Sequence, residues 1–167
     1  MEPYKCAGTV FIFKNGFDKV LTKELLDVIK DYEELILSDQ FNKKIKNLPK
    51  SILVLNVGCG FNNYLDNLHS LLTKLELKVA FNKNIYFLPN SLIDLKFGIK
   101  FNKKMDGLPN SILYLRTSSK YNREKTKFSN KLRLLTIPNP ILAKRYKKLT
   151  DSLYEKCDKK FKKNKFN

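Results

Sequence analysis

One line of sequence recurs at a fixed spacing, without insertion or deletion, through most of this chain. The line is clearest at residues 101–115, FNKKMDGLPNSILYL, where an aromatic residue and an asparagine precede Leu-Pro, a serine and an apolar run. An insertion-free period of about 20 residues is typical of a solenoid. Each coil of a solenoid is too small to bury its own apolar face and is stable only against its neighbours.

Apolar pairs two residues apart predict one short strand in every coil, because alternate residues of a strand face the same side. These pairs stand at 35/37, 55/57, 75/77, 95/97, 115/117 and 135/137, and Thr117 is their one polar member. Strands that repeat the same path must run parallel. We therefore predict a mainly β solenoid with one parallel sheet of about six short strands and helical caps at both ends.

The sequence divides into four segments. Residues 1–34 are predicted to form an N-terminal cap of a strand and a short helix, and residues 35–137 the repeats. An Asn-Pro start followed by an apolar stripe predicts a C-terminal capping helix over residues 138–157. Residues 158–167 combine like charges with no periodicity, so we expect a disordered basic tail.

Two columns of equivalent residues should run along the coil axis. The aromatic residues are expected to stack into a spine inside the core: Phe41, Phe61, Phe81, Phe101 and Tyr121. The asparagines that follow them are expected to point inward and to form a structural ladder: Asn42, Asn62, Asn82, Asn102 and Asn122. Their amides could bond backbone groups of their own coil and of the next. Ordinary exposed turn asparagines would give the same pattern, so both interpretations stay open.

The net charge of +17 is unevenly distributed. Residues 1–39 carry −3, residues 40–137 carry +13 and residues 138–167 carry +7. Lysine outnumbers arginine by 29 to four, so the positive field comes from hydrated point charges. Four cations follow the ladder asparagines and form a candidate anion-binding column: Lys43, Lys83, Lys103 and Arg123. Solvated lysines of a lysine-rich chain would also explain this column.

The outward side of the predicted sheet is a candidate protein-binding surface. Its residues are mixed in charge and include an aromatic ring: Asn56, Glu76, Lys96, Tyr114 and Arg116. A surface of this composition suits a protein partner better than a phosphate backbone.

The sequence offers no pattern for a catalytic, metal or cofactor site. His69 is the single histidine, so the usual histidine-based nucleophile and metal sites cannot be assembled, and we expect it at the surface. Cys6, Cys59 and Cys157 lie far apart, which argues against a disulfide framework and favours a reduced intracellular compartment. We expect no enzyme activity, no metal and no cofactor. No apolar run is long enough for a membrane span.

The recurring line F-N-x-x-I-x-x-L-P-x-S-[IL]-x-x-L-x-[VLF]-G, over about residues 35–137, resembles the FNIP repeat. This repeat is a relative of leucine-rich repeats best known from amoebae and giant DNA viruses. The resemblance implies a solenoid used for protein binding, joined in some members to an N-terminal F-box that recruits a ubiquitin ligase. Residues 21–29 are faintly similar to the opening of an F-box, although they stand in repeat phase and leave too little chain for a three-helix module.

Three functions follow from these observations. The first is a non-enzymatic protein–protein interaction scaffold with an unidentified protein partner. The alternatives are weak, electrostatic nucleic-acid binding through the basic column and the lysine-rich tail, and a ubiquitin-ligase substrate adaptor. We expect an intracellular location, in the host cytoplasm or nucleus if the chain is viral. The oligomeric state stays open, with a monomer favoured.

Overall fold

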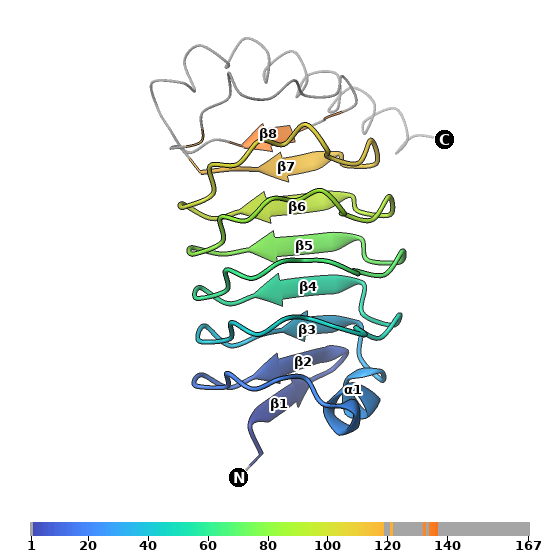
Figure 1. The fold of residues 1–167 in the computed structure, drawn as a ribbon. Helices are drawn as coiled ribbons and strands as arrows, with labels where there is room; N and C mark the ends of the chain where they lie inside the picture. Colours follow the sequence, from blue (N-terminus) through green and yellow to red (C-terminus); the bar gives the residue numbers. More distant parts are fainter. Residues whose placement is uncertain (1, 119–120, 122–131, 133, 137–167) are drawn as a thin grey trace, which may run out of the picture.

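The computed structural model describes residues 2–118, 121, 132 and 134–136, whose backbone forms a stack of coils along one axis (Figure 1). Eight strands form a single sheet in chain order. They are β1 (Tyr4–Ala7), β2 (Val10–Phe13), β3 (Glu34–Ile36), β4 (Val54–Val57), β5 (Lys74–Leu77), β6 (Asp94–Phe97), β7 (Tyr114–Arg116) and β8 (Leu134–Thr136). Each strand from β2 onward runs parallel to the next, whereas β1 pairs antiparallel with β2. The predicted β solenoid is confirmed.

The strand register repeats the sequence period. Leu55 of β4 pairs with Leu35 of β3 on one side and with Leu75 of β5 on the other. The same offset continues to β8, where Leu135 pairs with Leu115. Equivalent residues of successive coils therefore lie side by side, because one residue of each coil always meets the same residue of the next.

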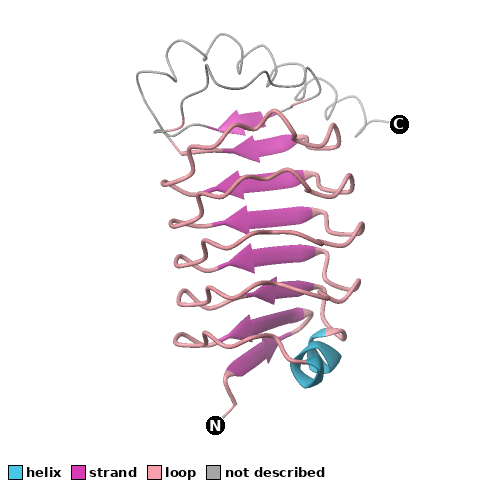
Figure 2. Ribbon diagram, viewed as in Figure 1, coloured by secondary structure: helices cyan, strands magenta, loops and turns pink. Residues whose placement is uncertain are grey.

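The first coil is longer than the others. Phe11 of β2 pairs with Leu35 of β3, whereas Leu35 itself pairs with Leu55, so the step along the sequence is larger between β2 and β3. The added length accommodates α1 (Lys23–Ile29), which lies at the N-terminal end of the stack (Figure 2). The Thr22 hydroxyl accepts the Leu25 N–H at 3.4 Å and caps the helix.

The N-terminal end differs from the strand and short helix that the sequence predicts, because β1 adds a further strand. Gly8 makes the turn between β1 and β2 with a positive φ of 58°, which glycine adopts without strain. The pattern missed β1 because its side chains are exposed or half-buried and show no apolar alternation. The predicted C-terminal capping helix over residues 138–157 and the tail over residues 158–167 lie outside the described residues.

The core lies between the sheet and the return segments of the coils, and stacked aromatic rings run through its length. The rings are, in order, Phe17, Phe41, Phe61, Phe81, Phe101 and Tyr121. Neighbouring centroids lie 6.0 to 6.2 Å apart, within the range of favourable offset stacking. Phe17 belongs to this column because the number of residues from Phe17 to Phe41 equals that from Phe11 to Leu35, which pair in the β2–β3 register.

Two glycines after the strands allow the backbones of successive coils to touch. A Cβ at Gly58 would lie 1.8 Å from the Ser38 carbonyl oxygen. A Cβ at Gly98 would lie 2.3 Å from the Lys78 carbonyl oxygen. Since the opposing atoms belong to the backbone, they cannot rotate away, and any side chain here would push the coils apart.

We expect Gly58→Ala to lower the free energy of unfolding by about 1–3 kcal/mol, as overpacking of a well-packed interior does. Gly107→Ala is the matched control, since a Cβ there meets nothing within 4 Å. Chemical denaturation of both variants measures the difference. Equal stability of the two variants would contradict the backbone contact.

The stacked rings allow a second comparison between identical substitutions. Phe61→Ala removes a ring that is 0% exposed and should cost about 3–5 kcal/mol of unfolding free energy through lost burial and an unfilled cavity. Phe87→Ala removes a ring that is 72% exposed and should leave stability nearly unchanged. Thermal unfolding of the two variants checks this contrast, and a similar loss for both would count against the stacked core.

Candidate binding surfaces

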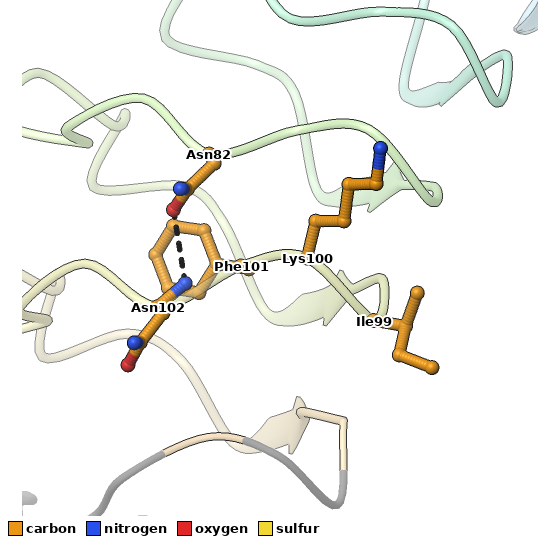
Figure 3. Close-up of a pocket in the computed structure, with 5 residues that line it drawn as sticks. All are labelled: Asn82, Ile99, Lys100, Phe101 and Asn102. Atoms are coloured by element: carbon orange, nitrogen blue, oxygen red, sulfur yellow. Dashed lines mark hydrogen bonds between the residues drawn. The ribbon is translucent and has the colours of Figure 1, made fainter.

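An asparagine ladder links the coils directly after the aromatic column. Asn42 Oδ1 accepts the backbone N–H of Asn62 at 2.9 Å, and Asn62 Oδ1 accepts that of Asn82 at 2.9 Å. Asn82 Oδ1 accepts that of Asn102 at 3.0 Å (Figure 3). These side chains are exposed or half-buried, which differs from the inward orientation that the sequence pattern predicts. The fifth ladder residue, Asn122, lies outside the described residues.

The ladder satisfies backbone groups where the sheet has ended. The asparagine N–H groups lie beyond the strands, so no strand carbonyl is available to accept them, and the amide oxygen of the previous coil takes that role. The first rung is different, because the Asn42 N–H is accepted by Asp18 Oδ1 at 2.8 Å. Phe17-Asp18 of the first coil thus occupies the place that Phe-Asn pairs occupy later, at an offset of 24 residues.

A shallow depression of about 460 Å³ opens beside the ladder. It is lined by Asn82, Ile99, Lys100, Phe101 and Asn102 (Figure 3). Lys100 is its single titratable group, and Phe101 is only 1% exposed. The depression therefore follows from coil stacking and carries no acid–base pair or nucleophile.

Loss of one rung should weaken the stack measurably. Asn82→Ala leaves the Asn102 N–H without its acceptor, and we expect a loss of about 1 kcal/mol of unfolding free energy. Asn84→Ala is the control, since Asn84 is exposed and its side chain makes no hydrogen bond within the described residues. Denaturant titration of both variants tests the ladder, which has no energetic role if the two curves coincide.

The outward face of the sheet carries charges that are paired between neighbouring coils. Lys96 Nζ donates to Glu76 Oε1 at 2.6 Å. Arg116 Nη2 donates to both carboxylate oxygens of Asp94, at 2.9 and 2.8 Å. Lys74 Nζ lies 3.9 Å from Asp94 Oδ2. These charged side chains are therefore held in defined positions along β5, β6 and β7.

The other two predicted members of the sheet surface extend this row. Asn56 Nδ2 donates to Glu34 Oε1 at 2.6 Å, one strand further toward the N-terminus. Tyr114 is 40% exposed on β7. All five residues predicted from the sequence thus share the outward face, and Glu34, Lys74 and Asp94 supply charged partners on the same face.

The predicted basic column is less uniform than its sequence suggests. Lys43 Nζ lies 2.9 Å from Asp18 Oδ2. Hydrogen bonding from Lys43, reinforced by the Asn42 N–H, holds the pKa of the Asp18 carboxyl below its usual value. Lys83 Nζ lies 5.2 Å from the ring centroid of Tyr64, a cation–π distance. Lys103 is half-buried, and Arg123 lies outside the described residues.

Cys59, Asp39 and His69 form no reactive centre within the part of the chain that the structure describes. Burial raises the pKa of the Cys59 thiol, and Asp39 beside it adds to the effect, so the thiol is protonated at neutral pH. The Cys59 backbone N–H, bonded to Asp39 Oδ1 at 3.1 Å, lowers the pKa of Asp39. His69 is half-buried, and desolvation lowers its pKa. Its Nδ1 accepts the Leu71 N–H at 3.2 Å, so the ring has a local structural role.

The described residues hold neither a cluster of metal ligands nor a membrane-spanning helix. No three His, Cys, Asp or Glu side chains in this part of the chain are grouped so that they could hold a metal ion. None of the helices in the described ranges has the length and apolar character that crossing a membrane requires.

Sequence reasoning missed one group of exposed side chains. Tyr64, Tyr86 and Phe87 are 50%, 70% and 72% exposed on the return segments. A comparison of equivalent positions could have found the last two, because Asp66 and Asp106 occupy the place of Tyr86 in the adjacent coils. The core does not require a ring at these positions, because adjacent coils have no aromatic residue there.

The chain is similar to CroV588, whose crystal structure is described as a novel circular LRR protein. The TM-score is 0.64 at 30% sequence identity. The chain has the fold of a leucine-rich-repeat-like solenoid. The similarity covers 75% of this chain and 20% of CroV588, so the chain spans about a fifth of that protein. No protein-family model and no curated protein matches the chain.

A leucine-rich-repeat-like solenoid is an architecture in which stacked short strands form an extended surface, and it is typically non-enzymatic. In this solenoid the outward face of the sheet is continuous from β3 to β7, with paired charges along it. The return segments form a second surface, which carries Lys43, Lys83 and Lys103 and the exposed rings.

Proposed function

We propose that this leucine-rich-repeat-like solenoid is a non-enzymatic protein–protein interaction scaffold of the FNIP type. The repeated F-N, L-P and serine positions support the FNIP assignment, and the likeness to an LRR protein supports the scaffold role. The partner is a protein that contacts the outward face of the sheet.

The paired charge row on that face carries this proposal. Interfaces gain affinity when their side chains are ordered before binding, because less conformational entropy is then lost. The Glu76–Lys96 and Asp94–Arg116 pairs provide this order. Tyr114 and Arg116 are also of the residue types that contribute most often to binding hot spots.

Electrostatic nucleic-acid binding is the second candidate. It is favoured by the placement of Lys83 and Lys103 on the return segments, away from the paired charges of the sheet face. The ubiquitin-ligase adaptor hypothesis has less support, since residues 2–34 contain a single helix of 7 residues in place of a three-helix F-box.

An exchange of two paired charges tests the sheet face. Glu76→Lys combined with Lys96→Glu keeps an ion pair and the net charge but reverses the pattern that a partner meets. We expect the amount of partner protein captured from a lysate of the native cells to fall about tenfold. Loss of a charge-complementary contact has an effect of this size. Thermal unfolding should change little, since the exchange keeps an ion pair and surface pairs contribute little to stability.

Lys104→Glu is the control for this exchange, because Lys104 is exposed on a return segment. It should leave capture of the same partner intact. A partner that binds the exchanged variant as well as the original chain would exclude the sheet face as its site.

A further inference from the structure

Exposed aromatic rings gather on one return segment of the solenoid. Tyr86 and Phe87 are adjacent, 70% and 72% exposed, with ring centroids 6.4 Å apart and an interplanar angle of 74°. Lys83 on the same segment reaches the ring of Tyr64 on the preceding one. We call Tyr64, Tyr86 and Phe87, together with Lys83, the aromatic cluster.

The core does not explain these rings. Burial is the main energetic benefit of an aromatic side chain, and Tyr86 and Phe87 leave most of their surface in water. The adjacent coils place Asp66 or Asp106 and Asn67 or Gly107 at the same positions. Exposed rings that packing does not require are typical of a binding surface.

The two sides of the solenoid differ in charge. The outward sheet positions carry three cations and three anions, for a net charge of zero: Glu34, Lys74, Glu76, Asp94, Lys96 and Arg116. The return segments carry a net charge of +5 over residues 42–50, 62–70, 82–90 and 102–110. Four of these five charges lie in residues 42–50, whereas the three segments around the rings together carry +1. The cations that an anion could meet beside the rings are Lys83, Lys103 and Lys104.

We propose that the return segments bind single-stranded nucleic acid at the aromatic cluster. Each nucleotide carries one phosphate and one base, and the surface offers cations beside exposed rings. Bases stack on Tyr86 and Phe87, while phosphates lie near Lys83 and Lys103. This combination of stacking rings and a basic track is typical of proteins that bind single strands with little sequence preference.

The carboxylates next to Tyr86 orient the bound strand. Asp66 and Asp106 stand one coil away on either side, about 4.8 Å per coil, so they repel phosphates from the ring side. They can instead accept hydrogen bonds from the amino groups of bases. The phosphates are thereby confined to the side that carries Lys83, three residues before Tyr86 on the same segment.

A double helix is a poorer ligand, because its bases are stacked inside and cannot reach the rings. An acidic protein would satisfy the lysines but would supply few planar rings for stacking. Both are outcomes of the experiment below. Single-strand binding at the aromatic cluster rests on the second candidate function, nucleic-acid binding, and not on the sheet face. Its failure would leave the protein-partner proposal untouched.

The test uses the full 167-residue chain and a fluorescein-labelled oligoadenylate RNA of about 12 nucleotides, followed by fluorescence anisotropy. Tyr86→Ala combined with Phe87→Ala should weaken binding by roughly tenfold or more, with the salt dependence unchanged. Lys83→Ala combined with Lys103→Ala should instead reduce the slope of log affinity against log salt by about 1.4. Tyr114→Ala, which removes a ring 40% exposed on the sheet face, is the matched control and should bind like the original chain.

Two outcomes would overturn the proposal. One is unchanged affinity after loss of Tyr86 and Phe87, because binding would then come from charge alone. The other is equal competition by polyglutamate or by an RNA duplex, because neither presents unstacked bases. Thermal unfolding of each variant verifies that the solenoid is intact, which we expect because Tyr86, Phe87 and Tyr114 are exposed and Lys83 and Lys103 are no more than half-buried.

Discussion

The hydrogen-bonded register between successive strands is the constraint on which the rest of this molecule depends. Every pair from β3 to β8 joins a residue to its equivalent in the next coil. A one-residue insertion within a strand would shift its partners and turn core side chains outward, whereas the longer first coil places its extra residues outside the strands and keeps the register. One repeated offset therefore produces the aromatic column, the asparagine ladder and the close backbone contact at Gly58 together.

Stacking of equivalent residues has opposite consequences inside and outside the coil. Inside, identical rings gain from lying side by side. On the sheet face, identical charges would repel, and the register avoids this by setting Lys96 directly opposite Glu76. Arg116 is the exception, because it lies opposite Lys96 and reaches diagonally to Asp94 instead. The paired row is thus a consequence of the solenoid and not a separate addition to it.

The period predicted the strands and the composition of each column, since both depend only on which residues recur. It could not predict how side chains turn once the coils are stacked. The ladder asparagines are exposed or half-buried, and each side-chain oxygen accepts a backbone N–H of the next coil. The period did not identify Phe17 and Asp18 as the first members of the two columns. The inserted helix lengthens their spacing from Phe41 and Asn42 to 24 residues. Likewise, the Lys43–Asp18 and Lys83–Tyr64 contacts join residues that follow no common spacing.

A solenoid this thin presents both sides of its core to solvent, and its two surfaces can act separately. Its core is one layer of side chains, about 10 Å across, as between other packed layers. That thickness is similar to the Debye length of about 8 Å at physiological salt. Mobile ions therefore weaken the positive field of the return segments around the edge of the solenoid, and the charges of the sheet face already balance one another. A protein on the sheet and an anionic strand on the return segments would neither compete nor attract each other strongly.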